Sequence, residues 1–137
     1  EETPDVIIVG IPGGIISFNE KNHMHYGIYA YEICNAINPD YNIVNAWVDT
    51  FNLIIYDDLQ KITHYRYSTK IDSICLSNIS IFNDYSIIDR LSLEYNVYNK
   101  NKVDDKIKDL GLKSIYNVVD LNSMDKLAED IIEKLSK

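Results

Sequence analysis

Glycines crowd the stretch GIPGG at residues 10–14, the most specific chemical feature of the chain. Glycine adopts positive φ without strain and leaves backbone N–H groups uncovered, so this loop can cradle an anion or admit a second chain at close range. The spacing matches neither the GxxxxGK[ST] phosphate loop nor the GxGxxG dinucleotide loop. Two interpretations stay open: Gly10, Pro12, Gly13 and Gly14 contact a ligand, or they form a tight structural turn.

A pair of histidines, His23 and His25, follows the glycines with one residue between them. In an extended segment this spacing turns both imidazoles to the same side, as zinc or copper ligands require. A catalytic zinc site needs a third protein ligand. The only obvious candidates for it are Glu20, Glu32 and the distant His64. We therefore expect no metal and favour solvated imidazoles before a helix over an acid–base role. Asn22, His23 and His25 remain candidates for ligand binding, and the sequence identifies no cofactor.

Two aspartates stand where parallel sheets bind their ligands. Asp49 follows the apolar run at residues 41–48, and Asp120 follows the run at residues 114–119. An acid at the carboxyl end of a strand can orient a ligand hydroxyl, hold a cation or cap the next helix. Capping is the commoner role, so we expect Asp49 or Thr50 to cap a helix, while Asp49 and Asp120 stay candidate ligand-binding residues.

These residues need a scaffold, and the hydrophobic pattern predicts alternating strands and helices. Apolar runs predict strands at residues 5–10, 41–48, 73–82, 92–98 and 114–119. Helical spacing predicts helices at about residues 26–37, 50–65, 103–110 and 123–135, with a short helix or turn at 83–91. Gly111 is expected to end the third of these helices, and Asn122 or Ser123 to cap the last.

Alternation of this kind predicts parallel strands joined by right-handed crossovers, with helices on both faces of the sheet. We expect a three-layer α/β fold, Rossmann-like or flavodoxin-like, with about five mainly parallel strands. The 137 residues suit a single domain, 1–137. Because the first predicted strand follows closely on an N-terminus without Met, we expect this to be the C-terminal domain of a longer chain.

An acidic composition narrows the classes of partner. Thirteen Lys and Arg against 21 Asp and Glu give a net charge of −8, which argues against nucleic-acid binding because phosphate backbones repel such a surface. No apolar stretch predicts a membrane span, and no signal-peptide pattern opens the chain. Cys34 and Cys75 lie in apolar patterns typical of reduced thiols, which favours a cytoplasmic location. Neither cysteine stands at a helix N-terminus and GxSxG is absent, so nucleophilic catalysis has little support.

Three stretches of the sequence resemble one family. PDVIIVGIPGGI at residues 4–15, YGI at 26–28 and AYEICNA at 30–36 resemble the clostridial peptide maturation system proteins. Those proteins accompany radical SAM enzymes and small cysteine-rich peptides in natural product biosynthesis cassettes. The resemblance implies an accessory protein of peptide maturation, with a cassette peptide or a radical SAM enzyme as partner. It carries over no catalytic residue.

We therefore expect an accessory or binding domain that takes a peptide, a partner protein or a small ligand at the glycine-rich loop. The alternative is an enzyme or a cofactor- or nucleotide-binding module that uses the crevice at the carboxyl ends of the strands. Exposed tyrosines would favour a partner surface or a homo-oligomer, and tyrosines half-buried at helix–sheet edges are the competing interpretation. The tyrosines concerned are Tyr26, Tyr29, Tyr65, Tyr67, Tyr95 and Tyr98.

Overall fold

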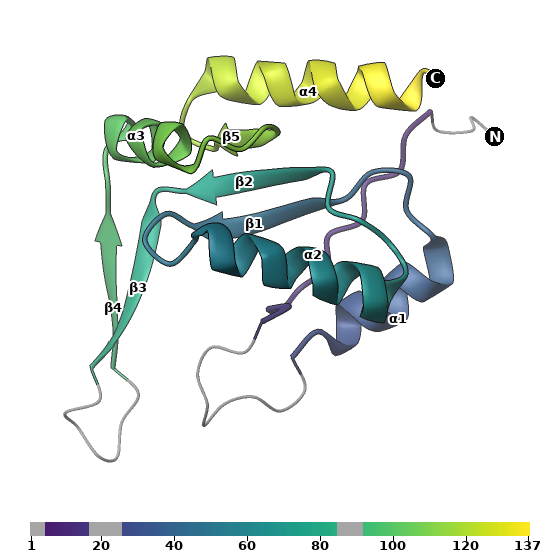
Figure 1. Cartoon of the computed structure of the whole chain (residues 1–137), viewed down its shortest axis with the longest axis horizontal. Coiled ribbons are helices and arrows are strands. Elements are labelled where there is room, and N and C mark those ends of the chain that lie inside the picture. The colour runs from purple at the N-terminus through teal and green to yellow at the C-terminus, as the bar shows by residue number, and fades with distance from the viewer. Residues whose placement is uncertain (1–4, 17–25, 85–91) are drawn as a thin grey trace.

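The computed structural model describes residues 5–16, 26–84 and 92–137 and has a mixed α/β architecture (Figure 1). Its elements in chain order are α1 (Ile28–Ile37), β1 (Ile43–Trp47), α2 (Leu53–Tyr67), β2 (Ser73–Ser77), β3 (Ile79–Asp84), β4 (Ser92–Val97), α3 (Lys100–Leu110), β5 (Ile115–Asn117) and α4 (Leu121–Leu135). The short helix or turn predicted at residues 83–91 lies outside the described residues, apart from 83–84 at the end of β3.

Three of the predicted strands form a parallel sheet in the order β1-β2-β5. Val44 of β1 lies opposite Ile74 of β2, and Ile74 in turn lies opposite Ile115 of β5. Helices occupy the connections between these strands, because neighbouring parallel strands can be joined only by a crossover. The α/β class predicted from the alternating pattern is confirmed.

The prediction of about five mainly parallel strands is corrected at β3 and β4, which form a separate antiparallel pair with Ile79 opposite Val97. The apolar run at residues 73–82 is two strands, because the chain turns at Asn78. The Asn78 side-chain amide donates to the Tyr98 carbonyl at 2.9 Å, and the Tyr98 N–H donates to the Asn78 carbonyl at 2.9 Å. These bonds lead β3 out of the parallel sheet, and Figure 1 shows the pair running across the direction of β2.

Residues 5–10, predicted as the first strand, do not form one in the structure. The run is strongly exposed: Ile7 is 76% exposed and Ile8 91%. Its β-branched residues meet the local requirement for a strand, but a strand also needs a neighbour to share its backbone hydrogen bonds. Among the described residues, no strand pairs with this segment.

The period of two along each strand divides the core between the two faces of the sheet. Ile74 and Leu76 of β2 face α2 and α3, and they pack in one cluster with Leu59 and Val103. Cys75, on the opposite face of β2, packs with α4. The α1 helix lies beside α2, where Ala30 and Cys34 pack on Tyr67. Helices therefore cover both faces of the sheet.

Several helix ends differ from the predicted caps. Asn52, and neither Asp49 nor Thr50, caps α2, because its side chain accepts the Ile55 N–H at 3.0 Å. The cap predicted at Asn122 or Ser123 is also wrong: both residues lie inside α4, which begins after Asp120. The predicted C-cap at Gly111 is confirmed at φ 61°.

No helix within the described ranges combines the length and the apolar composition that crossing a bilayer requires.

Candidate functional site

The glycine-rich loop and the start of α1 enclose a hollow of about 280 Å³ on the surface. Its walls come from two short stretches, residues 12–14 and 26–30, which are separated along the chain but adjacent in space. The lining residues are Pro12, Gly13, Gly14, Tyr26, Gly27, Ile28, Tyr29 and Ala30. The structure thus brings together three of the predicted site residues, Pro12, Gly13 and Gly14.

Glycine is required at two of these positions for identifiable reasons. Gly13 has φ +91°, a left-handed backbone that residues with a Cβ rarely adopt. At Gly14 a Cβ would lie 3.1 Å from the ring of Tyr26. The Gly14 carbonyl accepts the Gly27 N–H at 2.9 Å, so a backbone hydrogen bond closes the hollow between its two walls.

Tyr67 of α2 lies beneath the hollow. Its side chain is 2% exposed, and its hydroxyl occupies the space that a Cβ on Gly27 would need, 2.1 Å from that ideal position. The hydroxyl has no hydrogen-bond partner within the described part of the chain. Burial raises the pKa of Tyr67, so the phenol stays neutral across the physiological range. A neutral, unpaired hydroxyl therefore stands directly under the backbone of Gly27.

Of the other predicted site residues, the described ones, Gly10, Asp49 and Asp120, do not line this hollow. A Cβ on Gly10 would have no atom within 4 Å, so Gly10 contributes no wall. Asp49 and Asp120 lie at the carboxyl ends of β1 and β5 and are absent from the lining. Asn22, His23 and His25 are outside the described residues. Among the described residues, the hollow is thus formed by the loop and α1, and the remaining residues of the predicted site stay a prediction.

Asp49 anchors the β3–β4 pair to the parallel sheet. The Tyr98 hydroxyl donates to the Asp49 carboxylate at 2.7 Å. Burial raises the pKa of Asp49, but this hydrogen bond and the nearby charges of Lys102 and Lys106 outweigh it, and the pKa lies below its ordinary value of 3.8. The same hydrogen bond is the main cause that raises the pKa of Tyr98. Asp49 is therefore ionised and engaged with Tyr98.

Asp120 is engaged in the same way at the end of β5. Its carboxylate lies 2.9 Å from the Lys100 amine, and this contact raises the pKa of Lys100. Beside it, the Asn117 side-chain amide donates to Asp104 at 2.8 Å and to the Lys100 carbonyl at 3.2 Å. At the carboxyl edge of the sheet, Asn117 and Asp120 are therefore engaged in polar contacts with residues of α3.

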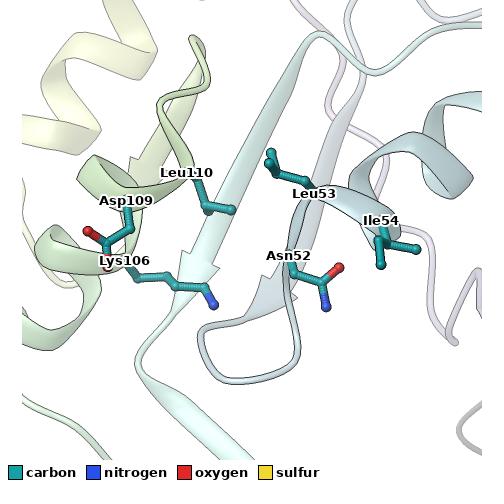
Figure 2. Close-up of a pocket in the computed structure, with 6 residues that line it drawn as sticks. All are labelled: Asn52, Leu53, Ile54, Lys106, Asp109 and Leu110. Atoms are coloured by element: carbon teal, nitrogen blue, oxygen red, sulfur yellow. The ribbon is translucent and has the colours of Figure 1, made fainter.

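A second hollow, of about 360 Å³, opens between the start of α2 and α3 (Figure 2). In Figure 2 the Lys106 amine reaches from α3 into the gap, on the side of Asn52. Partial positive charge gathers at the amino end of α2, because its first N–H groups lack helical partners. The lining residues are Asn52, Leu53, Ile54, Lys106, Asp109 and Leu110. Sequence reasoning missed this hollow; the signal was Asn52, a good cap residue a few positions after an apolar run.

The cysteines belong to separate parts of the core. Cys34 packs between α1 and α2, and Cys75 packs between the sheet and α4; both are free thiols. Burial raises the pKa of both, which keeps them protonated and unreactive. Within the described ranges no three His, Cys, Asp or Glu side chains gather as metal ligands would.

Comparison of the chain with protein-family models, with curated proteins and with solved structures gives no match.

Proposed function

We propose that this chain is an accessory binding domain that receives a short peptide segment in the hollow between the glycine-rich loop and α1. One observation carries the proposal: two glycine stretches lie against each other with exposed Tyr29 at their rim. Backbone without side chains lets a second chain approach closely, and an exposed tyrosine offers contact area at a small entropic cost.

The chemistry of the lining favours a neutral peptide over a charged ligand. Pro12, Ile28 and Ala30 are apolar, and none of the described residues that line the hollow is Lys, Arg, Asp or Glu. The Tyr67 hydroxyl below Gly27 adds one buried polar group without a partner among the described residues. Such a site suits an extended segment with one or two apolar side chains.

The resemblance to peptide maturation system proteins agrees with this class of ligand. It supports a cassette peptide, or a loop of a radical SAM enzyme, as the natural occupant. The two buried free thiols support a reducing, cytoplasmic setting for such a partner.

Peptide selection by phage display, followed by fluorescence anisotropy of the selected peptides, tests the proposal. Tyr29→Ala is expected to weaken binding by about three- to tenfold, because aromatic contacts contribute about 0.5–1.5 kcal/mol beyond the area they bury. Tyr65→Ala is the matched control: Tyr65 is 82% exposed on α2 and does not line the hollow. Failure to enrich any peptide, or equal loss in the two variants, contradicts the proposal.

A second candidate function rests on the other hollow, where Lys106 and the amino end of α2 would together favour a phosphate group. The cofactor- or nucleotide-binding alternative predicted from the sequence used the crevice at the carboxyl ends of the strands with Asp49 or Asp120, and neither aspartate lines this hollow. Thermal-shift measurements with inorganic phosphate and ATP, matched in ionic strength with sodium chloride, test the second candidate function. A rise in melting temperature that Lys106→Met abolishes and Lys108→Met retains supports a phosphate site. Equal shifts in phosphate and chloride contradict it.

A further inference from the structure

One edge of the parallel sheet has no neighbouring strand among the described residues. β1 is an outer strand, and among the described strands it pairs only with β2. The Val48 N–H donates to the Ser77 carbonyl on the β2 side at 3.1 Å. Because backbone groups alternate in direction along a parallel strand, Ala46 also faces β2 while Ile43 and Asn45 turn theirs to the open edge.

The sequence and register of β1 lack three features that commonly protect natural edge strands. Proteins commonly block an exposed edge with lysine, proline or a bulge. The β1 sequence IVNAW has no charge and no proline, and its register with β2 runs without a bulge. Strands of parallel sheets that read this way are usually interior strands with a neighbour on each side. The composition of β1 is therefore typical of a strand that pairs with another strand on each side.

The chain also contains a β-branched segment that pairs with no described strand and has a composition typical of strands. Residues 6–9 are the β-branched sequence VIIV, and their exposed fractions are 58%, 76%, 91% and 45%. With the next residue the segment has the same length as β1. Pairing would satisfy the outward backbone groups of Ile43 and Asn45 and remove apolar side chains from water.

The connection between this segment and β1 has the form that parallel pairing requires. α1 lies between them in the chain and packs beside α2, in the helical layer on the α2 side of the sheet. Segment, α1 and β1 thus repeat the arrangement of β1, α2 and β2, with the same hand. Ile15 is packed against the core near α1 and α2, so the segment is tethered close to its end.

We infer that the open edge of β1 accepts residues 6–10 of this same chain as an added parallel strand, giving the order 6–10, β1, β2, β5. The tether gives the segment a high effective concentration at its own β1. A second copy would have to overcome repulsion between two chains of net charge −8. The intramolecular occupant is therefore favoured over exchange between copies.

Amide hydrogen exchange measured by NMR on the ligand-free chain tests this inference. The Asn45 amide, on the open edge, is expected to exchange at least tenfold more slowly than an unpaired exposed amide. In the double variant Ile7→Lys/Ile8→Lys, which places a charge on each face of the added strand, Asn45 is expected to return to the unpaired rate. The Ala46 amide, bonded toward β2, stays protected and shows that the sheet remains folded.

Leu121→Lys is the control, because Leu121 is 82% exposed on α4, away from β1, and its change is expected to leave Asn45 protected. Unpaired exchange of Asn45 in the unmodified chain overturns the inference. So does protection that survives the double variant. Protection lost on dilution overturns it as well, since it would assign the added strand to a second copy. No peptide is present, so these outcomes are independent of the proposed function.

Discussion

At Gly27, two independent constraints disfavour a side chain larger than hydrogen. The backbone has φ +76°, and the Tyr67 hydroxyl occupies the place of a Cβ. The position joins the wall of the glycine hollow to the α1–α2 contact, so a methyl group there would disturb both.

Gly27→Ala is expected to destabilise the chain by about 1–2 kcal/mol from the left-handed backbone alone. The collision with Tyr67 adds about 1–3 kcal/mol, the usual cost of overpacking. Tyr67→Phe should cost little or stabilise, because it removes an unpaired buried hydroxyl. Urea unfolding of the two single variants and the double variant measures the coupling between them.

The double variant is expected to recover most of the collision cost, because phenylalanine lacks the offending oxygen. Gly10→Ala serves as the control, since a Cβ at Gly10 meets no atom within 4 Å. Strictly additive costs for Gly27→Ala and Tyr67→Phe would show that the hydroxyl does not occupy the space beneath Gly27.

Asp49 gives the molecule a specific dependence on pH. Its pKa is lowered in the folded chain, so its contribution to stability is fully present above the ordinary value of 3.8. That contribution is lost as pH falls through the lower folded pKa. Tyr98→Phe is expected to be less stable than the parent at pH 7, with the gap narrowing at pH 3. A gap independent of pH, in urea unfolding at both values, would contradict the ionised Asp49–Tyr98 contact.

Among the elements, those with strong local signals were predictable. The α3 helix has spaced apolar residues and a terminal glycine, Gly111, whose left-handed backbone the structure confirms. The parallel strands were predictable because their runs are apolar on both faces. Periodicity does not encode which strand will be a neighbour, and therefore the pairing of β3 with β4 was missed. Asn78, which follows the last residue of β2, hydrogen-bonds to Tyr98 and so separates β2 from β3 within one stretch predicted as a single strand.

The site was predictable only in part, for a similar reason. Glycine spacing identified Gly13 and Gly14, whose conformations are local properties. The contact of that loop with α1 joins Gly14 and Gly27, 13 positions apart, and the contact of Gly27 with Tyr67 joins residues 40 positions apart in the chain. Asp49 and Asp120 were placed correctly at strand ends, but their partners Tyr98 and Lys100 come from other elements.

At the start of α2, the corrected cap can be tested directly. Asn52→Ala is expected to destabilise the chain by about 1 kcal/mol, the usual cost of losing an N-cap side chain. Asn122→Ala is expected to change stability little, because Asn122 is exposed within α4 and caps nothing. Thermal unfolding of both variants measures the difference. Unchanged stability of Asn52→Ala would contradict the cap at Asn52, and a loss of about 1 kcal/mol in Asn122→Ala would support the sequence-based cap of α4.

The contact of α4 with the sheet is sensitive to alkali. The Tyr116 hydroxyl of β5 donates to the Asp130 carboxylate of α4, and burial together with this bond raises the pKa of Tyr116 to about 12. The neutral phenol is the favoured form, so this contribution to stability is present below pH 10 and lost as pH rises toward 12. Tyr116→Phe should flatten the loss of stability above pH 10. When alkaline titration is followed by ultraviolet absorbance, Tyr116→Phe should show one fewer tyrosine that ionises near pH 12.

On the scale of the whole molecule, the apolar interior is divided. A large cluster joins the sheet to α2 and α3, while α1 rests on a small cluster of Ala30, Cys34 and Tyr67. Elements with few buried apolar partners open more readily than those embedded in a large core. We therefore expect α1 to detach in local openings that leave the sheet intact.

Cys34 lies in the small cluster under α1, and Cys75 lies in a third cluster between the sheet and α4, so the two thiols report openings of different parts of the chain. Under mild denaturant, a thiol reagent should modify Cys34, beneath α1, well before Cys75, enclosed between the sheet and α4. Mass spectrometry at timed intervals, with Cys34→Ser and Cys75→Ser to assign the phases, would read the two rates separately. Simultaneous labelling would mean that the molecule comes apart only as a whole.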